Sequence, residues 1–190
     1  MTEAPTSLGS RTHWRNWAGN ERTATEVVQP GSADEVAAVL VAAAAAGRRV
    51  RPIGSGHSFT GIGRPEDIQL ACGGLAGVGE VGADGLVTVG AGIPLHRLNA
   101  ELVRGGWSLT NLGDIDRQTV AGALSTGTHG TGARFGGLGT QVRGLQLVTP
   151  SGEVLDCDAT RHPDVFSAAR VGLGKGHSGE RARRPGDRST

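Results

Sequence analysis

The sequence predicts a mixed fold in which a parallel strand–helix–strand unit is followed by antiparallel hairpins. The unit consists of a strand at 25–29, an alanine-rich helix and a strand at 49–53, a connection that implies neighbouring parallel strands. Two turn signals downstream, Asp84-Gly85 and Pro150-Ser151-Gly152, each separate two apolar runs, as in β-hairpins. Glycine is abundant, with 33 residues, and two loops combine it with hydroxyl side chains and a histidine.

Local signals justify each element in turn. Ser32 and Glu35 form a capping box at the start of the first helix, alanine favours its interior, and Gly47 is placed to end it. Pro94 suits the first turn of a second helix, which reaches Val103. The other expected elements are strands at 68–72, 78–81, 86–89, 107–109, 142–149 and 154–156, a helical turn at 119–125 whose N-terminus would attract phosphate, and a helix at 163–170.

Composition excludes several classes of function. The net charge of +1 gives no electrostatic reason to expect nucleic acid or a membrane as a partner. Cys72 and Cys157 do not make a disulfide framework, and the six histidines are too scattered for a metal site. The apolar run 36–46 is too short to span a bilayer, and no signal peptide is visible. We therefore expect a soluble, cytoplasmic protein without a metal.

The stretch 51–59 contains two glycines and a histidine directly after the strand at 49–53. Glycine tolerates positive φ and has no Cβ, so the N–H groups of such a loop can converge on a phosphate. The loop after this strand also lies at the carboxyl edge of the sheet, where ligands of open α/β sheets bind. A plain turn with an exposed His57 explains the stretch equally well, so these residues alone leave both interpretations open.

A second stretch, 111–132, is again rich in glycine and hydroxyl side chains and carries His129. Two such loops suit opposite sides of one extended, polyanionic cofactor. Here the chain resembles the vanillyl-alcohol oxidase family of FAD-binding (PCMH-type) oxidoreductases. The segments 54–58 and 125–130 carry the resemblance, which covers residues 14–174. Within the family they are most similar to the D-arabinono- and L-gulono-1,4-lactone oxidases and to alditol oxidase.

The resemblance implies an α+β fold, with two α/β subdomains that hold FAD between them. It also implies that FAD is attached covalently through His57, where a ring nitrogen of a neutral imidazole can act as nucleophile. The residues expected to wrap the pyrophosphate are Arg51, Pro52, Ile53, Gly54, Ser55, Gly56, His57 and Ser58. Those expected on the flavin side are Gly113, Asp114, Thr119, Gly122, Thr126, Gly127, Thr128 and His129.

Three of these positions carry open alternatives. Asp114 stands where family members usually have serine, which puts its hydrogen bond in doubt. His129 either contacts the flavin or only buttresses the loop. Gly113 occupies the position where a small residue is thought to admit oxygen in oxidase members, which suggests an oxidase without establishing one.

Two competing site types lack their motifs. A Rossmann site needs G-x-G-x-x-G, and the third glycine is missing after Gly54-Ser55-Gly56. The same tripeptide is one residue short on each side of the G-x-S-x-G of serine hydrolases.

The predicted domain boundaries are a disordered N-terminus at 1–13, an incomplete FAD-binding domain at 14–174 and a disordered basic tail at 175–190. The tail contains no Val, Ile, Leu, Phe or Trp and cannot bury enough apolar surface to order itself. It also departs from the apolar strand expected of the family, so we expect a truncated chain, for instance after a shifted reading frame. A basic tail that binds a polyanion is the rival interpretation.

The predicted function is flavin-dependent oxidation of a CH–OH group in a sugar lactone or alditol. A hydride would pass to the flavin N5 atom, and oxygen or another acceptor would take the electrons. The catalytic base stays unnamed because family members carry it in a substrate domain that is absent here. The alternative is a catalytically inactive flavin-binding remnant.

Overall fold

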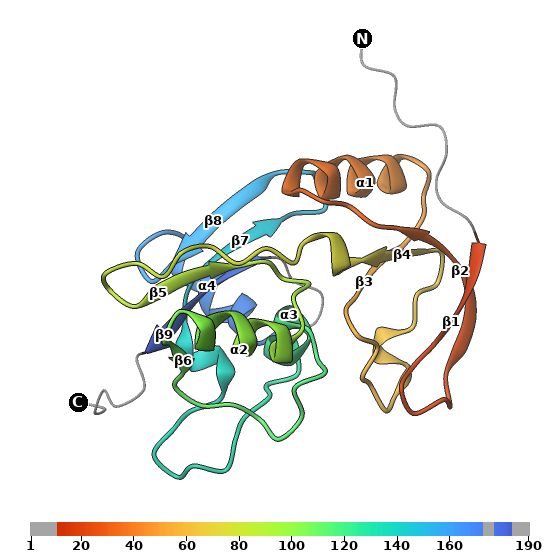
Figure 1. The fold of residues 1–190 in the computed structure, drawn as a ribbon. Coiled ribbons are helices and arrows are strands. Elements are labelled where there is room, and N and C mark those ends of the chain that lie inside the picture. The colour runs from red at the N-terminus through yellow and green to blue at the C-terminus, as the bar shows by residue number, and fades with distance from the viewer. Residues whose placement is uncertain (1–10, 173–176, 184–190) are drawn as a thin grey trace.

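The computed structural model describes residues 11–172 and 177–183, which form two sheets flanked by four helices (Figure 1). The first sheet has the order β1-β2-β4-β3. Its strands are β1 (Arg11–Arg15), β2 (Arg22–Val28), β3 (Val50–Ile53) and β4 (Ile68–Ala71).

The first sheet is largely parallel, as the strand–helix–strand unit predicts. Strands β2 and β3 both run parallel to β4, whereas β1 is antiparallel to β2. The expectation that β2 and β3 are direct neighbours is wrong, because β4 lies between them. The predicted disordered N-terminus is also too long, since 11–13 belong to β1. This strand lies at the edge of the sheet, where exposed polar side chains are tolerated.

Helix α1 (Ala33–Ala45) connects β2 to β3 and begins as its sequence predicts. The hydroxyl of Ser32 accepts a hydrogen bond from the Glu35 amide over 3.2 Å. The Glu35 carboxylate accepts from the amide of Gly31 rather than from that of Ser32. Both contacts satisfy amides that have no partner inside the helix, which stabilises its start.

The second sheet has the order β5-β9-β7-β8, and β6 pairs with β9. Its strands are β5 (Leu86–Val89), β6 (Ser108–Leu109), β7 (Val142–Val148), β8 (Val154–Asp158) and β9 (His177–Arg183). The hairpin predicted around 150–152 joins β7 to β8. The other predicted hairpin is only partly formed, because Val78 makes an isolated bridge to Val89 and 78–81 is not a strand.

Strand β9 corrects the prediction of a disordered tail from residue 175. It lies between β5 and β7 and pairs antiparallel with both. Strand pairing uses main-chain N–H and C=O groups, so a segment without large apolar side chains can still form a strand. Residues 175–176 and 184–190 of the predicted tail lie outside the described residues.

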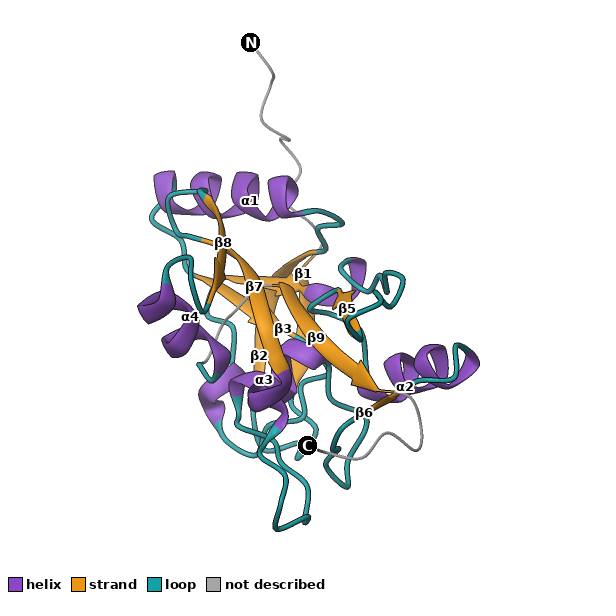
Figure 2. Ribbon diagram, turned by 90° about the vertical axis from the view of Figure 1, so that its left-hand side faces the viewer, coloured by secondary structure: helices purple, strands orange, loops and turns teal. Residues whose placement is uncertain are grey.

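The remaining helices are α2 (Leu95–Arg104), α3 (Val120–Ser125) and α4 (Pro163–Arg170). Short 3-10 turns span Gly61–Gly63, Cys72–Gly74 and Leu138–Gln141. In Figure 2, α4 and α2 flank the strands of the second sheet from opposite sides. The main apolar core lies here and joins β5 and β7 to buried side chains of all three helices, including Leu98, Val120 and Phe166.

The two sheets are also joined by close backbone packing. A Cβ atom at Gly92 would lie 1.7 Å from the carbonyl oxygen of Cys72, so the chain after β5 runs directly against the turn after β4. This contact holds the carboxyl end of the first sheet beside α3. In the part of the chain that the structure describes, no helix has the length and apolar character needed to cross a membrane.

Candidate cofactor-binding site

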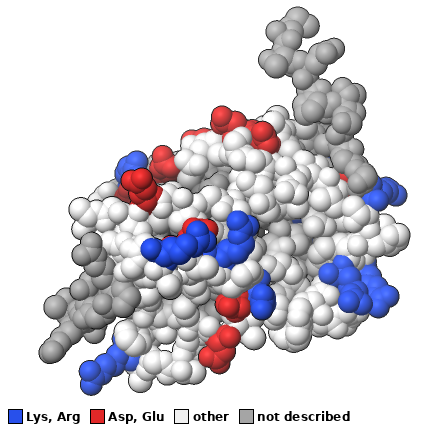
Figure 3. Space-filling view, viewed as in Figure 1, with Lys and Arg blue, Asp and Glu red and all other residues white. Residues whose placement is uncertain are grey.

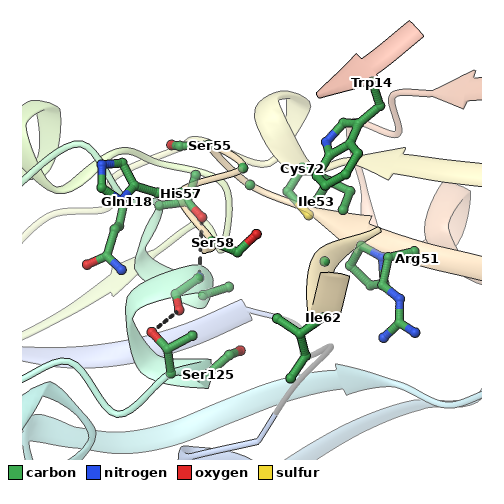
Figure 4. Close-up of a pocket in the computed structure, with 18 residues that line it drawn as sticks. Trp14, Arg51, Ile53, Ser55, His57, Ser58, Ile62, Cys72, Gln118 and Ser125 are labelled. Carbon is green, nitrogen blue, oxygen red and sulfur yellow. Dashed lines mark hydrogen bonds between the residues drawn. The ribbon is translucent and has the colours of Figure 1, made fainter. Parts of the chain in front are cut away.

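A pocket lies where the carboxyl end of the first sheet faces α3 (Figure 4). One wall is the end of β3 with the loop that follows it, 51–58, and the opposite wall is the segment 118–126. Trp14 of β1, Ile62, Gly63 and Cys72 complete the lining. The two glycine- and hydroxyl-rich stretches of the sequence therefore meet across one cavity.

The loop 54–58 is held in place from outside the pocket. Gly56 has φ +64°, a conformation that favours glycine. Its carbonyl accepts a hydrogen bond from the Trp17 amide over 2.8 Å. Asn16, which is 1% exposed, donates from its side chain to the carbonyl of Ser58, also over 2.8 Å. The carbonyl groups of the loop are thus partly used for anchoring.

The amides of the same loop have no such use. None of the N–H groups from Ser55 to Ser58 donates a hydrogen bond to another described residue. The hydroxyl oxygen of Ser58 is buried and has no hydrogen-bond partner within the described ranges. A buried polar atom without a partner is costly, which is a reason to expect a ligand there. Free amides on a glycine turn are the donors that bind phosphate oxygens.

The start of α3 behaves differently. The amides of Val120 and Ala121 donate to the carbonyls of Ile93 and Ala91 over 2.9 and 3.0 Å. The amide of Gly122 donates to the hydroxyl of Thr119, which caps the helix. The prediction that this N-terminus attracts phosphate is therefore wrong, because its amides are already bonded within the protein.

Gly54 brings the two walls into contact. A Cβ atom at this position would lie 2.1 Å from the Thr119 hydroxyl oxygen, far inside van der Waals contact. Only a residue without a side chain allows the loop to approach α3 this closely. The narrow approach fixes the distance between the free amides and the hydroxyl groups of the opposite wall.

Comparison with known proteins identifies the fold and the family. Residues 24–158, most of the chain, match the family described as "FAD binding domain". The chain belongs to this family. A cholesterol oxidase from Brevibacterium sterolicum has the same fold as this FAD-binding domain, with a TM-score of 0.82 at 19% identity over 92% of this chain and 37% of that one. The predicted α+β fold of a PCMH-type FAD-binding domain is thereby confirmed.

Curated relatives of the FAD-binding domain have lactone-oxidising names. An L-gulono-1,4-lactone dehydrogenase from Mycobacterium tuberculosis is 43% identical over 85% of this chain and 37% of its own length. A D-arabinono-1,4-lactone oxidase from Eremothecium gossypii is 39% identical over 85% and 32%. An L-gulonolactone oxidase from Bos taurus is 38% identical over 85% and 37%. The chain therefore spans about a third of the length of these relatives.

The pocket contains most of the residues that the sequence predicts for FAD. Those that line it are Arg51, Pro52, Ile53, Gly54, Ser55, Gly56, His57, Ser58, Thr119, Gly122 and Thr126. Those that do not are Gly113, Asp114, Gly127, Thr128 and His129. Among the second group, Gly113 packs against Thr128, since a Cβ atom there would lie 2.9 Å from the Thr128 methyl group. Their roles toward the flavin stay predictions.

Sequence reasoning missed seven lining residues, namely Trp14, Ile62, Gly63, Cys72, Gln118, Ala121 and Ser125. Gln118, Ala121 and Ser125 lie inside the second glycine-rich stretch, so their neighbours in sequence could have indicated them. Trp14 comes from β1 and Cys72 from the turn after β4, both distant in sequence from the two loops, and neither has a local signal. Burial raises the pKa of the Cys72 thiol to about 11, so this side chain adds no charge to the pocket at neutral pH.

The pocket has chemically different ends. In Figure 4, His57 and Gln118 lie at one end, and Trp14, Cys72 and Arg51 lie at the other. No ion pair to Arg51 is found among the described residues, so its guanidinium is available to an anion. On the face drawn in Figure 3, acidic and basic side chains are interspersed. The donors of the pocket, including the free amides, fit the polyanionic FAD of the family.

Proposed function

We propose that the pocket binds FAD and that the domain serves the oxidation of a CH–OH group in a sugar lactone or alditol. The free amides of Ser55–Ser58, opposite Thr119 across the pocket, carry the proposal. These amides and Arg51 would hold the pyrophosphate, and the apolar wall of Trp14, Ile53 and Cys72 would exclude water beside it. Bound FAD would supply the capacity to accept a hydride at its N5 atom.

Three lactone-oxidising relatives support this class of substrate, and their names leave the electron acceptor open. One is named a dehydrogenase and two are named oxidases. We accordingly propose oxygen or another acceptor for the electrons. Turnover is tested with gulonolactone, arabinonolactone, xylitol and sorbitol, each with oxygen and with an artificial dye as acceptor. FAD binding without turnover on this panel would favour the alternative, an inactive flavin-binding protein.

The proposed attachment point for FAD is His57, which lines the pocket on the glycine loop. A ring nitrogen of His57 would form a bond to the 8α carbon of the flavin. One methyl C–H bond and the imidazole N–H bond would break, which releases two protons and leaves two electrons. These electrons would pass to a two-electron acceptor such as oxygen, which completes the balance.

Covalent attachment is tested by intact mass and by flavin fluorescence after denaturation of the chain incubated with FAD. The expected mass is that of the chain plus FAD, less two hydrogens. His57→Ala should bind FAD reversibly and lose it on denaturation. His13→Ala, which replaces an exposed histidine of β1, is the matched control and should retain attachment. A bare-chain mass for the unmodified protein would exclude covalent attachment while leaving reversible binding intact.

We also propose a reducing, cytoplasmic setting. Cys72, in the turn after β4, and Cys157, in β8, are both free and buried. Buried free thiols of this kind are ordinary in reducing compartments, where disulfides are rare.

A further inference from the structure

Two large aromatic side chains are exposed next to the pocket. Trp17 is 60% exposed and Phe59 is 63% exposed. Both contact His57: the Trp17 and His57 rings are stacked with centroids 4.6 Å apart at 23°, and Phe59 meets His57 edge-on at 6.3 Å. Most large apolar side chains are buried, so an exposed cluster of aromatic side chains indicates a functional surface.

The backbone on both sides of His57 is fixed by the segment that carries Trp17. Gly56 accepts from the Trp17 amide, and Ser58 accepts from the Asn16 side chain. Asn16 is itself held, because its side-chain oxygen accepts from the Glu21 amide over 3.1 Å. The turn 16–21 therefore sets the main-chain position of His57, and the Trp17 ring lies against its side chain.

We propose that Trp17 is a positioning residue, which holds the imidazole plane of His57 for attachment to the flavin. The inference rests on the covalent attachment proposed above. A face-to-face stack restricts rotation of the imidazole about its Cβ–Cγ bond. It covers a ring face but leaves the ring edge, where both nitrogens and their in-plane lone pairs lie. The nucleophilic atom thus stays accessible while its direction is fixed, as an oriented reaction requires.

The experiment compares Trp17→Leu, which removes the flat ring but keeps apolar bulk, with Trp17→Phe, which keeps a flat ring. Covalent attachment is followed over time by intact mass. Trp17→Leu should slow attachment about tenfold, the scale of one aromatic contact, and Trp17→Phe should restore most of the rate. Phe135→Ala, another exposed aromatic residue, is the matched control and should attach FAD at the rate of the unmodified chain.

Two further measurements separate positioning from a general loss of structure. Reversible FAD affinity, measured for each substitution in the His57→Ala background, should be unchanged. In the apoprotein, the indole ring current should shift the His57 ring protons in NMR spectra. This shift should disappear in Trp17→Leu and persist in part in Trp17→Phe.

The outcomes distinguish the two proposals. If the unmodified chain attaches FAD and Trp17→Leu attaches it equally fast, the role of Trp17 is refuted and covalent attachment stands. If the unmodified chain attaches no FAD, both fail together. A slow Trp17→Leu with a lowered reversible affinity would also count against positioning, since it would indicate damage to the pocket as a whole.

Discussion

The two walls of the pocket look alike in sequence and differ in what they offer a ligand. The loop 54–58 and the start of α3 both combine glycine with hydroxyl side chains. In the first, the amides from Ser55 to Ser58 are free, whereas the amides of Val120, Ala121 and Gly122 are bonded to the protein. A glycine- and hydroxyl-rich composition indicates that the backbone of a stretch makes close contacts. Only the hydrogen-bond partners of its amides show whether those contacts are with the protein or are left for a ligand.

The largest effect should come from Gly54→Ala, which forces the walls apart. The added Cβ would lie 2.1 Å from the Thr119 hydroxyl oxygen. We expect the free energy of unfolding to fall by about 1–3 kcal/mol and FAD affinity to fall about a hundredfold. Thermal denaturation and titration with FAD measure the two effects. Gly77→Ala is the control, because a Cβ there meets nothing within 4 Å. Equal behaviour of the two variants would mean that the close approach is unnecessary.

A pH effect should come from the wall beside the first loop. Burial raises the pKa of Cys72 from 9.0 to about 11, so above pH 9 the unfolded chain loses a proton that the folded chain keeps. The free energy of unfolding should therefore fall with rising pH between 9 and 11, by up to about 1.4 kcal/mol per pH unit. Urea denaturation at several pH values measures it.

Few other groups interfere in this range, since the chain has no tyrosine and one lysine, Lys175. Burial also raises the pKa of Cys157. Cys72→Ala and Cys157→Ala should each flatten part of the pH dependence. An unchanged slope in Cys72→Ala would show that this wall is hydrated.

Ser58→Ala tests whether the loop 54–58 serves the ligand rather than the stability of the apoprotein. The Ser58 hydroxyl oxygen is buried without a partner, so its removal should leave the free energy of unfolding of the apoprotein unchanged or raise it. FAD affinity should fall about tenfold if this hydroxyl donates to the cofactor. An apoprotein destabilised by Ser58→Ala would indicate a structural role instead.

Thr119→Ala, on the opposite wall, should affect the stability of the apoprotein more than its affinity for FAD. The Thr119 hydroxyl caps α3 by accepting from the Gly122 amide over 3.2 Å. Its loss should lower the free energy of unfolding by about 1 kcal/mol, as for other N-caps. FAD affinity should change less than in Ser58→Ala. A larger loss of affinity in Thr119→Ala would place the main cofactor contacts on the second wall.

Sequence predicted the elements of the fold better than their order. The strands at 68–71 and 142–148 and the helix at 33–45 follow from apolar runs and capping residues that act locally. The position of β4 between β2 and β3 could not be predicted, because periodicity does not specify which strands pair. Strands β1 and β9 were missed because neither has an alternating apolar pattern, and pairing through the main chain does not need one.

In the site, too, the sequence predicted local features but not contacts between distant segments. The first loop could be predicted because its glycines, its histidine and its place after a strand are all local features. The occupied amides of α3 could not, because their partners, Ala91 and Ile93, come from the chain after β5. Trp17 shows the limit most clearly, since nothing in its own neighbourhood indicates that it stacks on a residue forty positions away.

Strand β3, which leads into the pocket, is at the edge of its sheet, and Pro52 lies within it. An open edge is normally a template on which a second polypeptide can add a strand. Proline has no N–H group to offer such a newcomer. The rim that must stay accessible to a small molecule is thereby protected against intermolecular sheet growth and aggregation.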